Sequence, residues 1–315
     1  MLPEWIWGDF MGVIKRISII GLGAVGSTYA SKLHDMDEKC LSVIADAARF
    51  EKYTAKAFII NDKRYHFHYV KPEDRVEPAD LIIVAVKFHH LQQAIKDMKN
   101  HVGPNTIIIS LMNGISSEQI IGDTYGMEKL LYGMVLAIGA ERDNNKTSYA
   151  STAKIYFGEK NNITYSEKVT AVKELFDRAN IGYMIPENMM YALWWKFMFN
   201  VGINQTSAVL RATYKVFQEV WEAEALLRAA MEEVLELSLI TGIKLKEEDI
   251  DEFVSLVKRQ SPDSKTSMLQ DVEARRKTEV EMLSGTVCEL GKQYGVDTPI
   301  NKTLYHIIKT IEKTY

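Results

Sequence analysis

Lys196, Asn200 and Asn204 are polar residues spaced four apart in a segment that is otherwise apolar or glycine. On an α-helix this spacing turns each residue by about 40° from the last, so the three form a narrow stripe about 12 Å long. Their neighbours, from Trp194 to Val201, spread apolar groups around most of the helix. Because a buried ammonium or amide is costly without a polar partner, we predict a polar ligand or a buried network there, with the lysine available as a general acid. An exposed stripe on a surface helix is the alternative.

A glycine-rich turn indicates a second site. The apolar run Ile17–Ile20 reads as a strand, and a helix is expected from Ala24 onward; between and around them lie Gly21, Leu22, Gly23, Ala24, Val25 and Gly26. In such a turn the first glycine permits the bend, the second lets the backbone approach a pyrophosphate, and the third allows close helix–strand packing. A plain turn is the alternative, but the strand-to-helix position favours dinucleotide binding.

The residues after the second predicted strand bear on which dinucleotide binds. Asp46 follows that strand, and Arg49 comes three residues later. A carboxylate here can bind the ribose hydroxyls of NAD and repels the 2′-phosphate of NADP, whereas an arginine can bind that phosphate. Asp46 can equally cap the next helix. The cofactor form, NADP or NAD, therefore stays open.

Two further strands end in polar residues. Asn113 and Gly114 follow the run Thr106–Met112, and Lys87 follows Asp80–Val86. Ligands of open α/β sheets bind outside the carboxyl ends of the strands, so these side chains are candidates for the same cleft. An ordinary strand-end turn and a lysine whose stem packs on apolar surface are the alternatives.

Near the C-terminus, Ser267 opens the segment Ser-Met-Leu-Gln, which resembles a capping box at a helix start. A helix N-terminus with a hydroxyl can also bind a carboxylate. Glu279 lies shortly after three basic residues and is by default a solvated charge. The seven histidines show no metal-ligand spacing, and we expect no metal site.

The elements that must position these residues fall into two groups. Strands are expected at Arg16–Ile20, Leu41–Ala45, Asp80–Val86, Thr106–Met112, Leu130–Ala137, Lys154–Phe157 and Gly182–Ile185, alternating early on with helices at Ala24–Asp35 and His90–His101. After Pro186 only helices are expected, at Glu187–Ala208, Val216–Thr241, Lys246–Gln260, Ser267–Tyr294 and Pro299–Tyr315. This order predicts an α/β fold: a Rossmann-type, doubly wound parallel sheet followed by an all-helical domain. We expect an N-terminal extension at 1–12, a dinucleotide-binding domain at 13–186 and a helical substrate and catalytic domain at 187–315.

Composition limits the partners. The 315 residues include 38 Lys and Arg against 42 Asp and Glu, a net charge of −4 that gives no reason to expect nucleic acid. No apolar run is long enough for a membrane helix, and the first residues lack the pattern of a secretory signal. Two cysteines are too few for a disulfide framework. We expect a cytoplasmic protein whose natural start is either Met1 or Met11.

These motifs together resemble the ketopantoate reductase (2-dehydropantoate 2-reductase) family over almost the whole chain after Val13. The lysine helix combined with the Ser-Met-Leu-Gln-Asp segment is specific to that family, whereas the glycine turn is not. The resemblance implies that Lys196 donates a proton to the ketone oxygen and that Glu279 helps to hold this lysine and the cofactor ribose. It implies further that Lys87 and Asn113 contact the cofactor, and that the substrate is bound by Asn200, Asn204 and Ser267.

The expected activity is NAD(P)H-dependent reduction of 2-dehydropantoate to pantoate, on the route to pantothenate and coenzyme A. The resemblance implies NADP as the cofactor. Asp46, however, stands where family members that use NADPH usually place an arginine, and this departure makes NAD the other possibility. An NADH-dependent reductase of another branched 2-keto acid, of the D-2-hydroxyacid dehydrogenase type, is the alternative. A non-catalytic dinucleotide sensor would need only the glycine turn. Helical second domains often form dimer contacts, so a homodimer is possible.

Overall fold

The computed structural model describes residues 12–136, 141–149 and 153–315. The expected N-terminal extension, apart from Gly12, and the expected strand residue Ala137 lie outside these ranges. The chain divides into two compact units. The first unit ends at Met112 and resumes over Ser117–Met189, and the second unit comprises Asn113–Ser116 and Met190–Tyr315.

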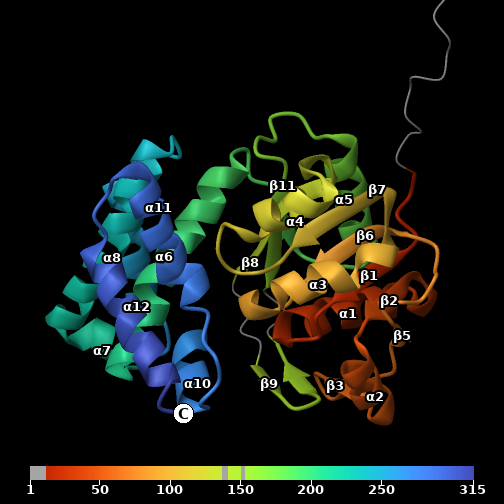
Figure 1. Ribbon diagram of the computed structural model, residues 1–315, viewed down its shortest axis with the longest axis horizontal. Coiled ribbons are helices and arrows are strands. Elements are labelled where there is room, and N and C mark those ends of the chain that lie inside the picture. Colours follow the sequence, from red (N-terminus) through yellow and green to blue (C-terminus); the bar gives the residue numbers. More distant parts are fainter. Residues whose placement is uncertain (1–11, 137–140, 150–152) are drawn as a thin grey trace, which may run out of the picture. The chain divides into compact units, whose positions relative to one another are not determined.

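The first unit is built on a large, mostly parallel sheet (Figure 1). In the described chain its eight strands run in the order β12 (Tyr183–Met184), β11 (Lys154–Gly158), β8 (Leu130–Leu136), β7 (Val102–Ser110), β6 (Ala79–Val84), β1 (Ile17–Ile20), β2 (Leu41–Ile44) and β5 (His68–Val70). Only the β8–β11 pairing is antiparallel among the pairs described. β1 lies between β2 and β6, so the sheet extends from it in both directions, which is the arrangement predicted for a doubly wound fold.

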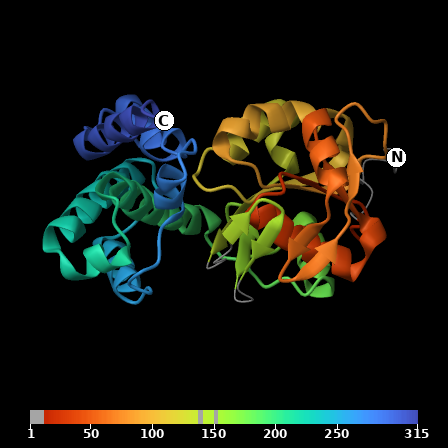
Figure 2. The same ribbon diagram turned by 90° about the horizontal axis from the view of Figure 1, so that it is seen from below.

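Helices cover both faces of this sheet, as the edge-on view of Figure 2 shows. They are α1 (Ala24–Met36), α2 (Ala47–Ala55), α3 (Leu91–Asp97), α4 (Ser117–Tyr125) and α5 (Glu167–Arg178). Alternation along β1 sends Ile19 into the core that includes α1 and α5, whereas Ile20 joins the core under α3 and α4. Short 3-10 turns lie at Glu38–Cys40, Phe88–His90, Lys99–His101 and Met127–Lys129.

A second, smaller sheet was not predicted. In the described residues it contains β4 (Lys63–Tyr65), β3 (Phe58–Ile60), β10 (Lys146–Ser148) and β9 (Glu141–Asp143), in that order. Its strands are only three residues long, too short for an alternating pattern to stand out. The Thr147 hydroxyl on β10 lies 2.9 Å from that of Ser27 on α1, which ties this sheet to the helix after the glycine turn.

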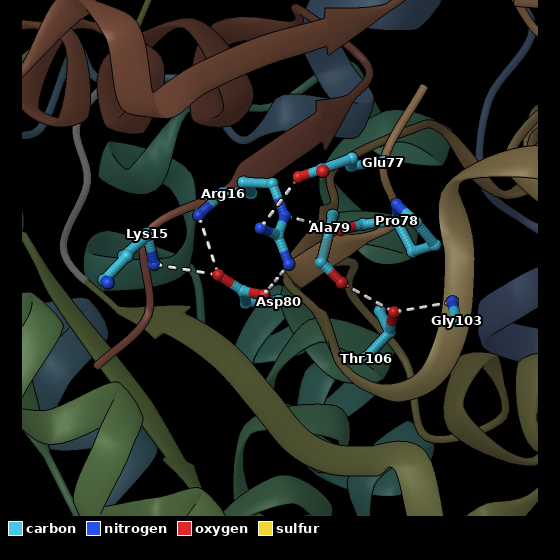
Figure 3. A network of polar contacts seen from close by, with 8 residues as sticks. All are labelled: Lys15, Arg16, Glu77, Pro78, Ala79, Asp80, Gly103 and Thr106. Atoms are coloured by element: carbon cyan, nitrogen blue, oxygen red, sulfur yellow. Dashed lines mark hydrogen bonds and ion pairs between the residues drawn. The ribbon is translucent and has the colours of Figure 1, made fainter. Parts of the chain in front are cut away.

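The amino ends of β1 and β6 are held together by a polar network (Figure 3). Asp80 accepts hydrogen bonds of 2.9 Å from the backbone N–H groups of Lys15 and Arg16, and its other oxygen pairs with the Arg16 guanidinium at 2.8 Å. Thr106 adds β7 by donating to the Ala79 carbonyl at 2.6 Å. This network fixes strand register at the end of the sheet opposite to the glycine turn.

His101 is a buried histidine whose ring makes one of its two possible hydrogen bonds. It is 1% exposed, Nε2 donates to the Lys71 carbonyl at 3.1 Å, and Nδ1 has no partner among the described residues. Burial lowers the pKa of His101, against the smaller opposing effects of the Lys71 carbonyl and Asp74. The neutral ring is therefore the form that suits the folded state.

We expect this histidine to make stability depend on pH. The unfolded chain takes up a proton near pH 6.5, whereas the folded state resists it, so the free energy of unfolding falls as pH drops below about 6.5, by at most about 1.4 kcal/mol per pH unit. Urea unfolding of the wild type and of His101→Gln between about pH 8 and pH 5 measures this. The variant should lose less stability on acidification; parallel curves would contradict the expectation.

The second unit is helical. Its elements are α6 (Met189–Leu210), α7 (Tyr214–Glu219), α8 (Trp221–Ile240), α9 (Glu247–Lys258), α10 (Ser267–Glu273), the π-helix η5 (Glu281–Gly285), α11 (Thr286–Tyr294) and α12 (Pro299–Glu312). The expected helix Val216–Thr241 is interrupted at Val220, and the expected helix Ser267–Tyr294 is broken between Glu273 and Glu281. No Pro or Gly marks either break, so composition gave no signal there. None of the described helices is long and apolar enough to span a membrane.

A close approach at a glycine and a buried hydrogen bond fix how two of these elements pack on α6. A Cβ at Gly202 would lie 2.7 Å from Met231 Cγ, so α6 and α8 approach closely at this glycine. Gln205 is fully buried, and its side-chain oxygen accepts from the backbone N–H of Ser284 in η5 at 3.1 Å. The register between α6 and η5 is therefore set by a specific hydrogen bond as well as by apolar packing.

Candidate active site

The polar stripe lies on α6, which is a buried helix. Lys196 is 9% exposed, and Asn200 and Asn204 are each 8% exposed. Phe197 and Val201, which lie beside the stripe on α6, are at most 1% exposed, so the helix is buried there as well. The prediction of a buried stripe is confirmed, and the alternative of a surface stripe is wrong.

A hydrogen-bond chain connects the two asparagines to the start of α10. Asn204 Nδ2 donates to Asn200 Oδ1 at 3.1 Å, and Ser267 Oγ donates to Asn204 Oδ1 at 3.0 Å. Asn200 Nδ2 is buried and has no hydrogen-bond partner among the described residues. Leaving such a donor unsatisfied costs about 1–3 kcal/mol, so an acceptor supplied by a ligand would relieve a real penalty.

Asn113 links the lysine to the buried glutamate. Lys196 Nζ donates to Asn113 Oδ1 at 2.9 Å, and Asn113 Nδ2 lies 3.5 Å from Glu279 Oε2, a long contact. Gly114 follows with φ of +88°, and a Cβ there would lie 2.7 Å from Met282 Cγ. Only glycine suits both the backbone angle and this close approach, so Gly114 allows the loop to bring Asn113 against η5.

One pocket collects most of these groups. Its polar lining contains five of the predicted site residues together with a second carboxylate, and its apolar lining comes from α10 and η5: Asn113, Asn200, Asn204, Ser267, Asp271 and Glu279, with Met268, Met282 and Leu283. Asp271 and the three apolar residues were not predicted as site residues. Asp271 belongs to the Ser-Met-Leu-Gln-Asp segment and could have been found there, whereas the apolar groups carry no signal in sequence.

Two predictions about this region are corrected by the structure. The residue that caps α10 is Thr266, whose hydroxyl accepts from the Leu269 N–H at 3.2 Å, so Ser267 is the first helical residue and not the cap. Its hydroxyl is thereby free to reach Asn204. Glu279 is 8% exposed, so its default reading as a solvated charge is wrong. The side chains of Ser267 and Glu279 both line the pocket.

The glycine turn in the first unit has the shape that a pyrophosphate requires. Gly21 has φ of +99°, and a Cβ at Gly26 would lie 1.9 Å from the Gly21 carbonyl oxygen, so neither position tolerates a side chain. At Gly23 an added Cβ would approach the described residues only at the Ala85 oxygen, 3.9 Å away. Open space therefore lies beside the N-terminus of α1, whose first turn carries no acidic residue. These residues fit a dinucleotide phosphate.

Asp46 caps α2, as one of its two interpretations predicted. Its Oδ1 accepts from the Arg49 N–H at 2.8 Å, and its Oδ2 pairs with the Arg49 guanidinium at 2.5 Å. Both oxygens are thus engaged by one residue, and the ion pair offsets the negative charge. Lys87 is exposed and follows β6, beyond Ala85, the residue whose carbonyl borders the glycine turn.

The fold and these side chains define a dinucleotide-binding protein with a helical second domain. Residues 17–162 match the family model described as "Ketopantoate reductase PanE/ApbA", and residues 188–312 match "Ketopantoate reductase PanE/ApbA C terminal". The chain belongs to the ketopantoate reductase family, as its motifs predicted.

Curated and solved relatives extend along nearly the whole chain. The 2-dehydropantoate 2-reductase of Vibrio cholerae serotype O1 is 24% identical over 300 residues, which are 95% of this chain and 99% of that protein. A D-mandelate dehydrogenase structure with NADH and anilino(oxo)acetate has a TM-score of 0.84 at 21% identity, covering 95% of this chain and 98% of its own. The dimeric ketopantoate reductase of Staphylococcus aureus has a TM-score of 0.79 at 21% identity, covering 95% and 99%. The two structural likenesses show the fold.

Proposed function

We propose that this protein reduces 2-dehydropantoate to pantoate with a reduced nicotinamide dinucleotide, and so serves pantothenate and coenzyme A biosynthesis. The observation that carries the proposal is the buried chain from Lys196 through Asn113 toward Glu279, which borders a pocket with an unpartnered asparagine donor. A protein that only sensed a dinucleotide, without catalysis, would need none of these buried groups. The family and the name of the Vibrio cholerae relative support the same activity.

In this reaction Lys196 acts as the general acid. When bound, the nicotinamide supplies the hydride that adds to the keto carbon. Lys196 Nζ gives a proton to the ketone oxygen as negative charge develops on it, so the carbonyl becomes an alcohol. Asn113 Oδ1 accepts one N–H of this ammonium and fixes its direction. Glu279 contacts Asn113 from the other side and supports this arrangement.

The pocket offers complementary walls for a branched hydroxy keto acid. Asn200 Nδ2 is a free donor for an oxygen of the substrate, and Asn204 and Ser267 lie next to it for the carboxylate and hydroxyl. Met282 and Leu283 supply apolar surface for the branched carbon. We assign substrate binding to the three polar residues on this basis.

We propose NADP as the cofactor. The proposal is supported by the engagement of both Asp46 oxygens, because a capped and paired carboxylate is a poor partner for ribose hydroxyls. The Arg49 side chain is 39% exposed and can still meet a phosphate. Gly21, Leu22, Gly23, Ala24, Val25 and Gly26 would hold the pyrophosphate, while Lys87 and Asn113 are the proposed contacts nearer to the nicotinamide.

The assay of turnover tests this proposal directly. Purified protein is mixed with 2-dehydropantoate, and the absorbance of NADPH and of NADH is followed in separate reactions. We expect turnover with NADPH and at least about 10-fold lower kcat/KM with NADH. Turnover with NADH alone would contradict the cofactor assignment only. Turnover of other branched 2-keto acids, with none of 2-dehydropantoate, would contradict the substrate assignment.

Asn200→Asp should weaken substrate binding without disturbing the fold. The variant keeps Oδ1 as acceptor for Asn204 but replaces the free NH₂ donor with a negative oxygen, close to where the substrate carboxylate would lie. A charge-assisted hydrogen bond contributes about 1.5–3 kcal/mol, so KM for the keto acid should rise about 10- to 100-fold. Steady-state kinetics measures this, with the unfolding midpoint as control. An unchanged KM would contradict the role of Asn200.

Three further properties are proposed. We retain a dinucleotide domain at 13–186 and a helical substrate and catalytic domain at 187–315. The dimeric Staphylococcus aureus relative supports a homodimer, which sedimentation can test. A biosynthetic reductase dependent on a nicotinamide cofactor is expected in the cytoplasm.

A further inference from the structure

Glu279 lies in an irregular segment, where its carbonyl oxygen accepts from the N–H groups of Met282 and Leu283 in η5. This segment follows α10, which ends at Glu273, and precedes η5, which begins at Glu281. The proposed chemistry nevertheless needs the Glu279 carboxylate at a defined position beside Asn113. The hydrogen bonds to η5 hold the carbonyl of Glu279, so other contacts must fix the chain before it.

We propose that Thr278 and Glu312 are positioning residues, which set Glu279 in the active site from the last turn of α12. This inference rests on the proposed function. It assigns to the C-terminal helix a part in the reaction that neither the motifs nor the pocket indicates.

The first contact lies directly before Glu279. One oxygen of Glu312, Oε1, accepts from the Thr278 N–H at 2.8 Å and from the Thr278 hydroxyl at 2.7 Å. The same hydroxyl accepts from the Val280 N–H at 3.3 Å, so its orientation is fixed on both sides. Thr278 is 1% exposed, and the Glu312 side chain is 9% exposed. Hydrogen bonds to a buried carboxylate are strong and directional.

A second contact lies two residues after Glu279. Lys309 on α12 pairs with Glu312 Oε2 at 2.9 Å and with Glu281 Oε1 at 2.5 Å. Burial alone would raise the pKa of Glu312, but the hydrogen bonds from Lys309 and Thr278 together hold it below the usual value, so the carboxylate stays ionised and accepts. Thr278, before Glu279, and Glu281, two residues after it, are thus both tied to the end of α12.

This double attachment matters because the contact it serves is long. Glu279 Oε2 lies 3.5 Å from Asn113 Nδ2, and Asn113 in turn accepts from Lys196. A small displacement of Glu279 would remove this contact and release Asn113. Misplacing a catalytic group by about 1 Å can lower a rate about 100-fold.

Paired variants separate positioning from general stability. Thr278→Val is isosteric but removes the hydroxyl, and we expect kcat to fall about 10-fold while KM for 2-dehydropantoate changes less than about 2-fold. Thr278→Ser keeps the hydroxyl and should retain kcat within about 3-fold. Glu312→Ala should behave as Thr278→Val does, whereas Glu312→Gln keeps an acceptor oxygen and should recover most of the rate. Glu289→Ala, which removes an exposed glutamate of α11, is the matched control.

Combining Thr278→Val with Glu279→Gln decides whether the effect passes through Glu279. If it does, Thr278→Val should lower kcat less than about 2-fold in the Glu279→Gln background. An equal loss in both backgrounds, or no loss in the active wild type, would overturn the inference and leave the proposed function intact. An inactive wild type would overturn the proposed function, and the inference with it.

Discussion

Lys196→Ala is expected to lower kcat by about 10²–10⁴-fold, because it removes the general acid from the keto oxygen. Dinucleotide binding should change less than about 3-fold, since the glycine turn that is proposed to hold the phosphates belongs to the first unit. Stopped-flow or steady-state absorbance measures kcat, and quenching of intrinsic fluorescence measures dinucleotide affinity.

Lys292→Ala provides the control for this variant, since Lys292 is an exposed lysine on α11. It should leave both quantities unchanged. Because Lys196 is 9% exposed, the Lys196→Ala protein must also be shown to unfold at a similar urea concentration. Near-normal turnover by a folded Lys196→Ala protein would refute the assignment of the general acid.

Gly23→Ala and Gly26→Ala should separate dinucleotide binding from folding. A Cβ at Gly23 projects into open space, so the fold should change by less than about 1 kcal/mol while dinucleotide affinity falls at least about 10-fold. A Cβ at Gly26 would collide with the Gly21 carbonyl oxygen at 1.9 Å. Because backbone must move to admit it, we expect a loss of more than about 2 kcal/mol in the free energy of unfolding.

The comparison of the two glycine variants is the informative measurement. Isothermal titration with NADPH gives affinity, and chemical denaturation gives stability. Equal affinity for NADPH in wild type and Gly23→Ala would show that the space beside α1 does not hold a phosphate. A fully stable Gly26→Ala protein would contradict the close packing of α1 on β1.

The parts of the fold that sequence predicted well are those with strong local patterns. The strand Ile17–Ile20 and the start of α1 at Ala24 agree with the expectation, because a buried apolar run meets a glycine turn there. The buried stripe on α6 was predictable because helical spacing alone decides which side chains share a face. The hydrogen-bond partners of the stripe were not predictable, because the contact of Lys196 with Asn113 depends on a loop that is distant in sequence.

Other features were missed for physical reasons that can be stated. The segment between α10 and η5 is irregular although nothing in its composition breaks a helix. Within it the Thr278 N–H and hydroxyl donate to Glu312 on α12, a partner that is distant in sequence. Thr266 and Ser267 are both good capping residues, and only the observed hydrogen bond distinguishes them. The second carboxylate of the pocket, Asp271, pairs with Arg276 at 2.9 Å, a contact that spacing does not specify.

The loop Asn113–Ser116 has a consequence for how this protein can be divided. It belongs to the helical unit, although the chain before it and the chain after it belong to the sheet unit. A fragment that begins after Pro186 would therefore lack Asn113, which accepts from Lys196, even if all its helices formed. Exchange of helical domains between relatives should succeed only when these four residues travel with the new domain. The two halves are thus not interchangeable modules joined at one point, and recombination between family members is constrained at two places in the gene.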